Sequence, residues 1–281
     1  MTAQDVIDQV KDLPVISETA RKVVILLAEA DTHRDELVKT IRCDNVLTAK
    51  LLRVCNSVDA GLKYPVASLD QAVLLLGDAV LFRMVSAIGF GADMRRALPG
   101  YAIEANGLWS HSLIVGLGAE YISKSETYGN FQPSLAFTAG LLHDIGKLLL
   151  TQVMTPKHRA DIRQEMTAQG RSRVEAERTV LGIDHAEAGA ALLEKWKLPD
   201  ILIEAVAHHH CPIAEPVHLS GVVYLANCAA YLNSAQSPDP QTVRVNKSAA
   251  ETLGIAIERI EPKMVEIHDA MKGINRYLAV A

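Results

Sequence analysis

A His-Asp pair in the middle of the chain offers the clearest chemistry that the residue types suggest. His143 and Asp144 lie in the strongly apolar segment 134–153. Desolvating a carboxylate costs several kcal/mol unless a partner balances its charge. Imidazole and carboxylate are both good ligands for Zn, Fe or Mn, so a divalent metal is one such partner. The alternative is that Asp144 pairs with Lys147 or His111 and that no metal is bound.

A metal site needs ligands from other segments, and other histidines are the candidates. These are His111, His185 and the run of His208, His209 and His210. His185 is expected in the first turn of a helix, which is an exposed position. Successive helical residues point about 100° apart, so two members of the run can approach one point while the third faces solvent. With His143 and Asp144, these histidines resemble a mononuclear or dinuclear metal site.

The elements that must position these residues are predicted to be helices. Apolar residues recur at spacings of three and four, which predicts an all-α fold. Ser68 and Asp184 are expected to cap helix N-termini, and Gly77 is expected to end a helix. The expected helices cover 17–30, 35–42, 46–55, the residues before Gly77, 79–88, 103–124, 134–153, 156–169, 174–181, 184–197, 199–210, 217–233, 247–253 and 257–279, with a short extended piece at 242–245.

Segment 89–100 contains three glycines and a proline, and this change in composition predicts a domain boundary. We therefore expect an N-terminal helical subdomain over 1–98, a helical bundle over 99–232 and a C-terminal helical extension over 233–281.

Composition excludes several classes of protein. The 281 residues are 49% hydrophobic and 22% charged, as in a globular chain rather than a disordered one. A net charge of −5 argues against a nucleic-acid partner. The apolar runs 73–76 and 148–150 are far shorter than the ~20 residues that cross a bilayer, so no membrane is expected. The acidic N-terminus lacks the pattern of a signal peptide, and the four cysteines form no C-x-x-C pair, so reduced thiols in the cytoplasm are expected.

The order of these motifs resembles the HDOD domain, an output domain of bacterial signalling proteins. It is related to the HD superfamily of metal-dependent phosphohydrolases and to the HD-GYP enzymes. The resemblance covers about residues 13–232 and is carried by Leu13-Pro14, DNVLTAKLLRVCNS (44–57), SLDQAVLLLG (68–77), LWSHS (108–112), GLLHDIGKLLL (140–150), Glu175-x-Glu177, GIDHAEAG (182–189), Trp196-x-Leu198-Pro199 and His209-His210-x-Pro212.

The resemblance implies an HD-like helical bundle and a signal-transduction module, which would bind a signalling protein partner or a phosphate-containing small molecule. The other implied function is a phosphohydrolase acting on a nucleotide or another phosphate ester. In that enzyme Asp144 and Lys147 are the catalytic candidates, and Lys147 would steady the charge of the phosphate. One or two divalent metals (Fe, Mn or Zn) would be held by His111, His143, Asp144, His185, His209 and His210.

Two departures from the HD pattern stand out. Asn227 takes the place of the aspartate that ends the HD ligand set, and the GYP segment is absent. The pairs Arg95-Arg96 and Arg171-x-Arg173 are expected on solvated faces, although either could approach a phosphate. No oligomeric state is predicted. We expect Asp144 to be buried within reach of His111, and we expect His208 to face away from the site.

Overall fold

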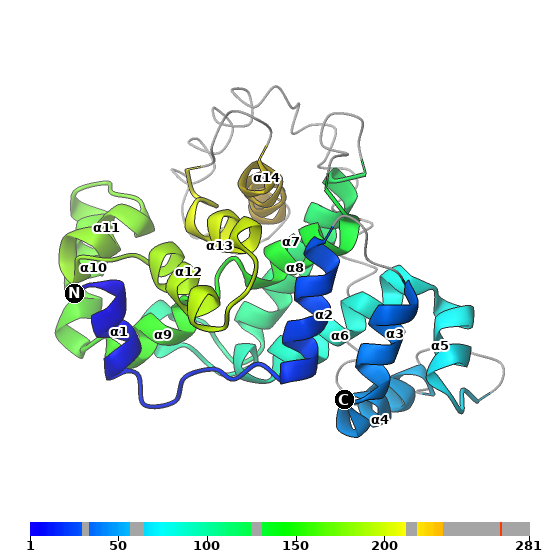
Figure 1. The fold of residues 1–281 in the computed structure, drawn as a ribbon. Helices are drawn as coiled ribbons and strands as arrows, with labels where there is room; N and C mark the ends of the chain where they lie inside the picture. The colour runs from blue at the N-terminus through cyan, green and yellow to red at the C-terminus, as the bar shows by residue number, and fades with distance from the viewer. Residues whose placement is uncertain (30–33, 57–64, 125–130, 212–217, 233–264, 266–281) are drawn as a thin grey trace.

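The computed structural model describes residues 1–29, 34–56, 65–124, 131–211, 218–232 and 265 (Figure 1). Within these ranges the chain is helical, with a single isolated β-bridge between Leu98 and Ile103 and no strand, which confirms the all-α prediction. The elements are α1 (Ala3–Gln9), α2 (Glu18–Ala28), α3 (Arg34–Arg42), α4 (Asn45–Cys55), α5 (Leu69–Leu76), α6 (Asp78–Met94), the 3-10 turn η2 (Pro99–Tyr101), α7 (Gly107–Ile122), α8 (Pro133–Leu142), α9 (Lys147–Val153), α10 (Pro156–Ala168), α11 (Arg173–Leu181), α12 (His185–Lys195), α13 (Asp200–Ala207) and α14 (Leu219–Leu232).

The elements expected at 242–245, 247–253 and 257–279, and with them the extension over 233–281, lie outside the described residues. No single helix among the described residues is both long and apolar enough to cross a membrane. Among these residues, only α5 and α6 taken together have the length and apolar composition of a membrane span, and the chain bends by 118° between them.

Several helices begin and end where local chemistry dictates. The Ser68 hydroxyl accepts a hydrogen bond from the Gln71 N–H, and the Asp184 carboxylate accepts one from the Glu187 N–H, so both predicted N-caps are present. Gly77 ends α5 with φ +76°, a conformation that a Cβ would strain.

Two hydrophobic cores organise the helices. The N-terminal core gathers buried side chains of α2–α5 and the first half of α6, from Ala20 to Val85. The central core joins the second half of α6 to α1 and α7–α14. In Figure 1, α3–α5 lie at one end of the molecule and α10 and α11 at the other. The domain limits 1–98, 99–232 and 233–281 stay predictions.

Helix α6 continues past the predicted stop at residue 88, so that prediction is wrong. Gly89 and Gly91 do not break the helix, because here they permit close packing. A Cβ on Gly89 would lie 2.6 Å from the Cβ of Ala20, and one on Gly91 would lie 2.8 Å from the Trp109 ring. These glycines bring α2 and α7 against α6.

The single helix predicted over 134–153 is also wrong, because it is divided into α8 and α9. Residues 143–146 form a tight turn in which the amide of Lys147 bonds to the carbonyl of Asp144 at 3.0 Å. A Cβ on Gly146 would overlap the His185 carbonyl oxygen, so the turn packs directly on the start of α12. The His-Asp pair therefore lies at a corner between two helices.

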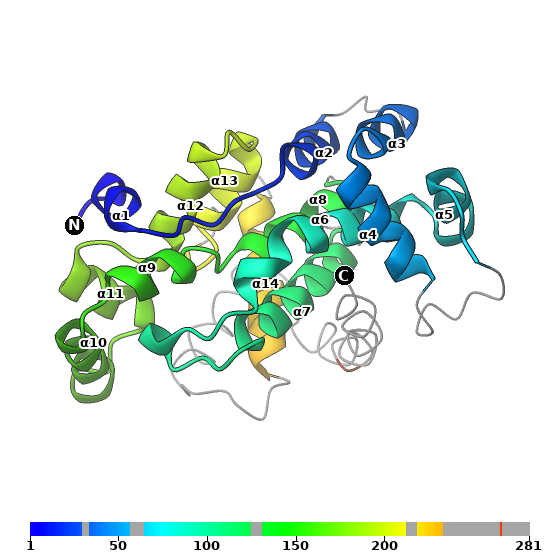
Figure 2. The same cartoon turned by 90° about the horizontal axis from the view of Figure 1, so that it is seen from below.

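The N-terminal helix α1 packs against α9 and α12 rather than against α2–α5. The segment that follows it runs along these helices to α2 (Figure 2). Gln152 on α9 donates to the Asp12 carbonyl at 3.1 Å, and the Trp196 indole donates to the Pro14 carbonyl at 3.2 Å. The first residues thus cover the central core before the chain enters the N-terminal core.

Candidate metal centre

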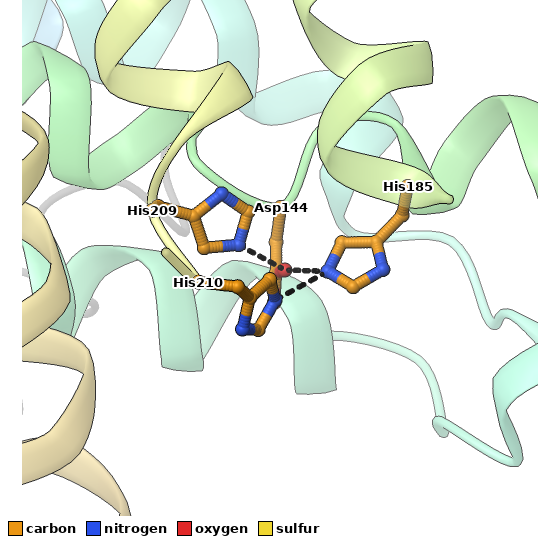
Figure 3. Close-up of side chains that lie close together, drawn as sticks. All are labelled: Asp144, His185, His209 and His210. Carbon is orange, nitrogen blue, oxygen red and sulfur yellow. Dashed lines mark hydrogen bonds and ion pairs between the residues drawn. The ribbon is translucent and has the colours of Figure 1, made fainter. Parts of the chain in front are cut away.

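Five imidazoles meet around one carboxylate, and we call these six side chains the His/Asp cluster. His111 comes from α7, His143 and Asp144 from the α8–α9 turn, His185 from the first position of α12, and His209 and His210 from the turn after α13. Their ligand atoms form two groups, each within 4.8 Å: one of Asp144, His185, His209 and His210, and one of His111, His143 and Asp144. Figure 3 shows the first group, with three imidazoles turned toward Asp144.

Asp144 is buried at the centre of the cluster, with 1% of its surface exposed. Its Oδ1 faces the Nε2 atoms of His185 at 3.3 Å and His209 at 3.7 Å. Its Oδ2 faces the Nε2 atoms of His143 at 3.3 Å and His111 at 3.7 Å. Each carboxylate oxygen therefore belongs to one of the two groups, and the predicted proximity of Asp144 and His111 is confirmed.

Two imidazoles are held so that the Nε2 atom of each points into the cluster. The Nδ1 atoms of His143 and His209 lie 2.7 Å from the carbonyl oxygens of Gly140 and Val206. A carbonyl can only accept, so each Nδ1 carries the proton. Burial holds the pKa of His209 well below its usual range, so that ring is neutral and its Nε2 offers a lone pair. Neither Nε2 has a hydrogen-bond partner, and both are buried. The lone pair of His209 faces an anionic carboxylate and repels it, and a cation between the two removes that repulsion. The residues fit a divalent metal.

His185 is fixed by a carboxylate instead. Glu177 Oε2 lies 2.7 Å from its Nδ1 and accepts its backbone N–H at 2.9 Å. Burial lowers the pKa of His185, but the attraction of Glu177 and the bonds to Asp144 and Glu177 outweigh it and raise the pKa to about 9. Its Nε2 lies 2.9 Å from the Nε2 of His210, so either one ring donates to the other or both lone pairs face one cation.

The expectation that His185 is exposed is wrong, since only 1% of its surface is accessible. The first turn of α12 is covered because Gly146 and Gly189 let the α8–α9 turn approach its backbone closely. His208 is exposed while His209 is buried, which confirms that His208 faces away.

Lys147 forms the pairing that the sequence left open. Its Nζ lies 2.5 Å from Asp144 Oδ2, and the residue is 8% exposed. Burial raises the pKa of Asp144, but His143 and Lys147 outweigh this effect and hold it well below its usual range. This pair occupies Oδ2, whereas Oδ1 faces the Nε2 atoms of His185 and His209. The pairing offered as an alternative to a metal is therefore present, and the metal and the catalytic role of Lys147 both stay predictions.

His111 occupies the edge of the cluster beside α14. Burial, reinforced by His143, lowers its pKa to about 3, so it is a neutral ring that can serve as a ligand. Asn227 acts on His111 from α14 and is itself 6% exposed, and its buried Oδ1 has no hydrogen-bond partner. The amide therefore stands where the HD pattern predicts a charged ligand.

In the sequence, Glu177 stands out only as part of the motif Glu175-x-Glu177. Tyr101 has no predicted role there. Glu177 is fully buried although it lies in a charged helix, and a spacing of eight residues before His185 was its one available signal. The Tyr101 ring lies 6.3 Å from the His185 ring in an edge-on arrangement. Nothing in the local sequence of Tyr101 indicates this contact.

Residues 13–212 match the sequence profile of the HDOD domain. The chain belongs to the HDOD domain family. This HDOD chain is 25% identical over 246 residues to an uncharacterized protein of Treponema pallidum (strain Nichols) and 30% identical over 167 residues to ribonuclease Y of Aquifex aeolicus (strain VF5). These matches take in 86% and 59% of the HDOD chain, but only 47% and 21% of the relatives, so it spans less than half the length of either.

A solved HDOD domain protein of unknown function from Geobacter sulfurreducens has the same fold. The HDOD chain is 22% identical to it, with a TM-score of 0.70, and the match covers 96% of this chain and 95% of that one.

Proposed function

We propose that this HDOD chain is a signal-transduction module that holds a divalent metal in the His/Asp cluster and binds a phosphate-containing small molecule there. A signalling protein docked elsewhere on the module would receive the output. The cytoplasm is the proposed place of action, since all four cysteines are free thiols.

One observation carries the metal proposal: the Nε2 atoms of His143 and His209 converge on a buried carboxylate, and each ring is fixed by its other nitrogen. Holding the second nitrogen of an imidazole ligand is how proteins orient metal sites. Asp144, His185, His209 and His210 would hold one ion, and His111 and His143 would hold a second ion across Asp144. Nitrogen and oxygen ligands of this kind suit Fe, Mn or Zn.

Elemental analysis of protein purified without chelator tests the metal directly. His209→Gln removes one ligand, and His208→Gln changes an exposed neighbour as the matched control. We expect one or two equivalents of metal in the wild type and in the control, and a large loss in His209→Gln. Equal metal content in His208→Gln and His209→Gln, or no metal and no thermal stabilisation by added Mn²⁺, would contradict the proposal.

The second candidate is a phosphohydrolase. It is favoured by the position of Asp144 between two ligand groups, since paired metals sharing ligands are common in phosphoester hydrolysis. The 30% identity to ribonuclease Y over 167 residues supports the same class. A bound metal would supply a polarised phosphoryl oxygen and a water of lowered pKa. Lys147 would then lie beside Asp144, where it can balance the charge of the phosphate.

Asn227→Asp separates the two candidates. If the site is a weakened catalytic centre, the added carboxylate restores a charged ligand beside His111, and we expect about 10–100-fold tighter Mn²⁺ binding with faster hydrolysis of a generic phosphodiester or a short RNA. If Asn227 is a structural residue, the substitution buries an unpaired carboxylate and lowers the free energy of unfolding by roughly 1–3 kcal/mol without any gain in activity. Titrating Mn²⁺ while following melting temperature and hydrolysis gives both readouts.

A further inference from the structure

A cationic side chain without a hydrogen-bonded anion lies beside the His/Asp cluster. Arg173, the first residue of α11, is half-buried and forms no hydrogen bond or ion pair within the described ranges. Its guanidinium lies over the Tyr101 ring, 5.2 Å from the centroid. Glu177, one turn further along α11, already bonds His185 through one carboxylate oxygen. Arg173 acts electrostatically on Glu177 but has no hydrogen bond to it, so the N–H groups of the guanidinium are available to a ligand.

Tyr101 connects this guanidinium to the cluster. Its ring lies 6.3 Å from the His185 ring and 5.6 Å from the Nζ of Lys147. An aromatic face holds a cation in place without neutralising it. Arg173 also acts electrostatically on Tyr231, whose ring lies 4.9 Å from His111 on the other side of the cluster. The guanidinium thus packs on a ring that itself contacts the cluster.

The position of Arg173 in its helix is a further sign that it serves a ligand. The N-terminus of a helix carries partial positive charge, so a cation at its first position is electrostatically unfavourable. An exposed arginine could turn away from the helix end, but this one is held over Tyr101. An anion bound next to Arg173 would remove the unfavourable interaction.

We propose that Arg173, held on the Tyr101 ring and assisted by Lys147, forms a subsite that binds a phosphate group of the ligand next to the metal. This inference rests on the proposed metal-dependent function and assigns its ligand subsite. Arginine suits the role because its planar fork can give two hydrogen bonds to a phosphate.

The local charges match a phosphate dianion. Asp144 and Glu177 contribute two negative charges, and Lys147 and Arg173 contribute two positive ones. One divalent metal on His185, His209 and His210 therefore leaves an excess of about two positive charges when the histidines are neutral ligands, and a second metal would raise that excess. A carboxylate would balance only half of that excess. The site therefore favours phosphate over carboxylate ligands.

Calorimetric titration of inorganic phosphate into Mn²⁺-loaded full-length protein tests the subsite. Arg173→Gln should weaken phosphate binding about tenfold or more, the loss expected for a charge-assisted hydrogen bond. Arg173→Lys should fall between Arg173→Gln and the wild type, because it keeps the charge and loses the fork. Arg163→Gln, which removes an exposed charge from α10, is the matched control and should bind phosphate as the wild type does.

The same variants separate failure of the subsite from failure of the metal site. Metal affinity, measured by Mn²⁺ titration alone, should be unchanged in Arg173→Gln, since Arg173 is not a ligand. Wild-type phosphate affinity in Arg173→Gln, or an equal loss in Arg163→Gln, overturns the subsite while leaving the metal proposal standing. If the wild type binds no metal, the titration is run on the metal-free protein. There, Arg173-dependent binding supports the subsite alone, and absence of phosphate binding overturns it.

Discussion

At the scale of single residues, the histidines of the cluster are held by different acceptors. Backbone carbonyls hold His143 and His209, whereas the carboxylate of Glu177 holds His185. A carboxylate acceptor makes an imidazole more basic, and therefore a stronger ligand, than a carbonyl does. Glu177 is thus the positioning residue whose charge would bear most directly on the affinity for the proposed metal.

Replacing Glu177 by Gln should lower metal affinity by about 10–100-fold, because the amide keeps the shape but loses the charge that supports His185. Competition between the protein and a chelator for Mn²⁺ measures the change. Glu175→Gln on the same helix is the control, since Glu175 is exposed and caps α11 through Ser172. Equal metal affinities in the two variants would show that Glu177 does not act through His185.

The sequence identified the members of the cluster more readily than their surroundings. His143 and Asp144 are chemically conspicuous in an apolar segment, so residue type was sufficient to find them, whereas the choice of His209 over His208 rested on the family resemblance. The burial of His185 depends on Gly146, almost forty residues away, and its acceptor Glu177 lies on a separate helix. Such contacts are set by tertiary packing, which local periodicity does not report.

At the scale of elements, the break between α8 and α9 shows the limit of periodicity. Segment 134–153 is apolar on all sides, so its pattern is equally consistent with one helix or two. The contact between Gly146 and the start of α12 favours two helices over one, and it places Asp144 in the turn between α8 and α9. At Gly89 and Gly91 the opposite occurs. These glycines were predicted to end a helix, but they lie inside α6, where the missing side chains allow Ala20 and Trp109 to pack closely.

Gly140 sets the spacing of the helices that carry His111 and His143. A Cβ there would lie 2.8 Å from the Cα of Gly116 and from the carbonyl oxygen of Val115, and backbone cannot move aside easily. We expect Gly140→Ala to lower the free energy of unfolding by about 1–3 kcal/mol, despite the higher helix propensity of Ala, and to weaken metal binding as α7 and α8 separate.

Gly77→Ala is the comparison for this variant, measured by the same thermal unfolding and Mn²⁺ titration. The added methyl meets open space, and only the positive φ costs about 1–2 kcal/mol. Both variants should lose stability, but only Gly140→Ala should lose metal affinity. Unchanged metal affinity in Gly140→Ala would mean that the spacing of α7 and α8 does not control the site.

At the scale of the whole molecule, α6 belongs to both cores. Its first half packs in the N-terminal core and its second half in the central core. Arg83 on α6 also bonds the buried carboxylate of Glu120 on α7 at 2.8 Å. A continuous helix and a buried ion pair across the junction should make the two cores unfold together.

Two buried thiols can report on this coupling, because Cys55 lies in the N-terminal core and Cys228 in the central core. Metal at one hundred times its Kd should stabilise the folded chain by about 2.7 kcal/mol. We expect Mn²⁺ to shift the denaturant dependence of labelling of both cysteines equally. A shift for Cys228 alone would show that the cores unfold independently.

The packing of α1 on the central core determines where this module can be truncated at its N-terminus. The family match begins at residue 13, after the helix that places Val6, Ile7 and Val10 in the central core at 0–6% exposure. A chain trimmed to the family limits would expose the faces of α9 and α12 that these side chains cover. Each buried apolar side chain that is lost lowers the free energy of unfolding by roughly 1.5–3 kcal/mol. Family boundaries drawn from sequence similarity therefore exclude part of the folding unit, and a recombinant fragment or domain fusion should start before α1.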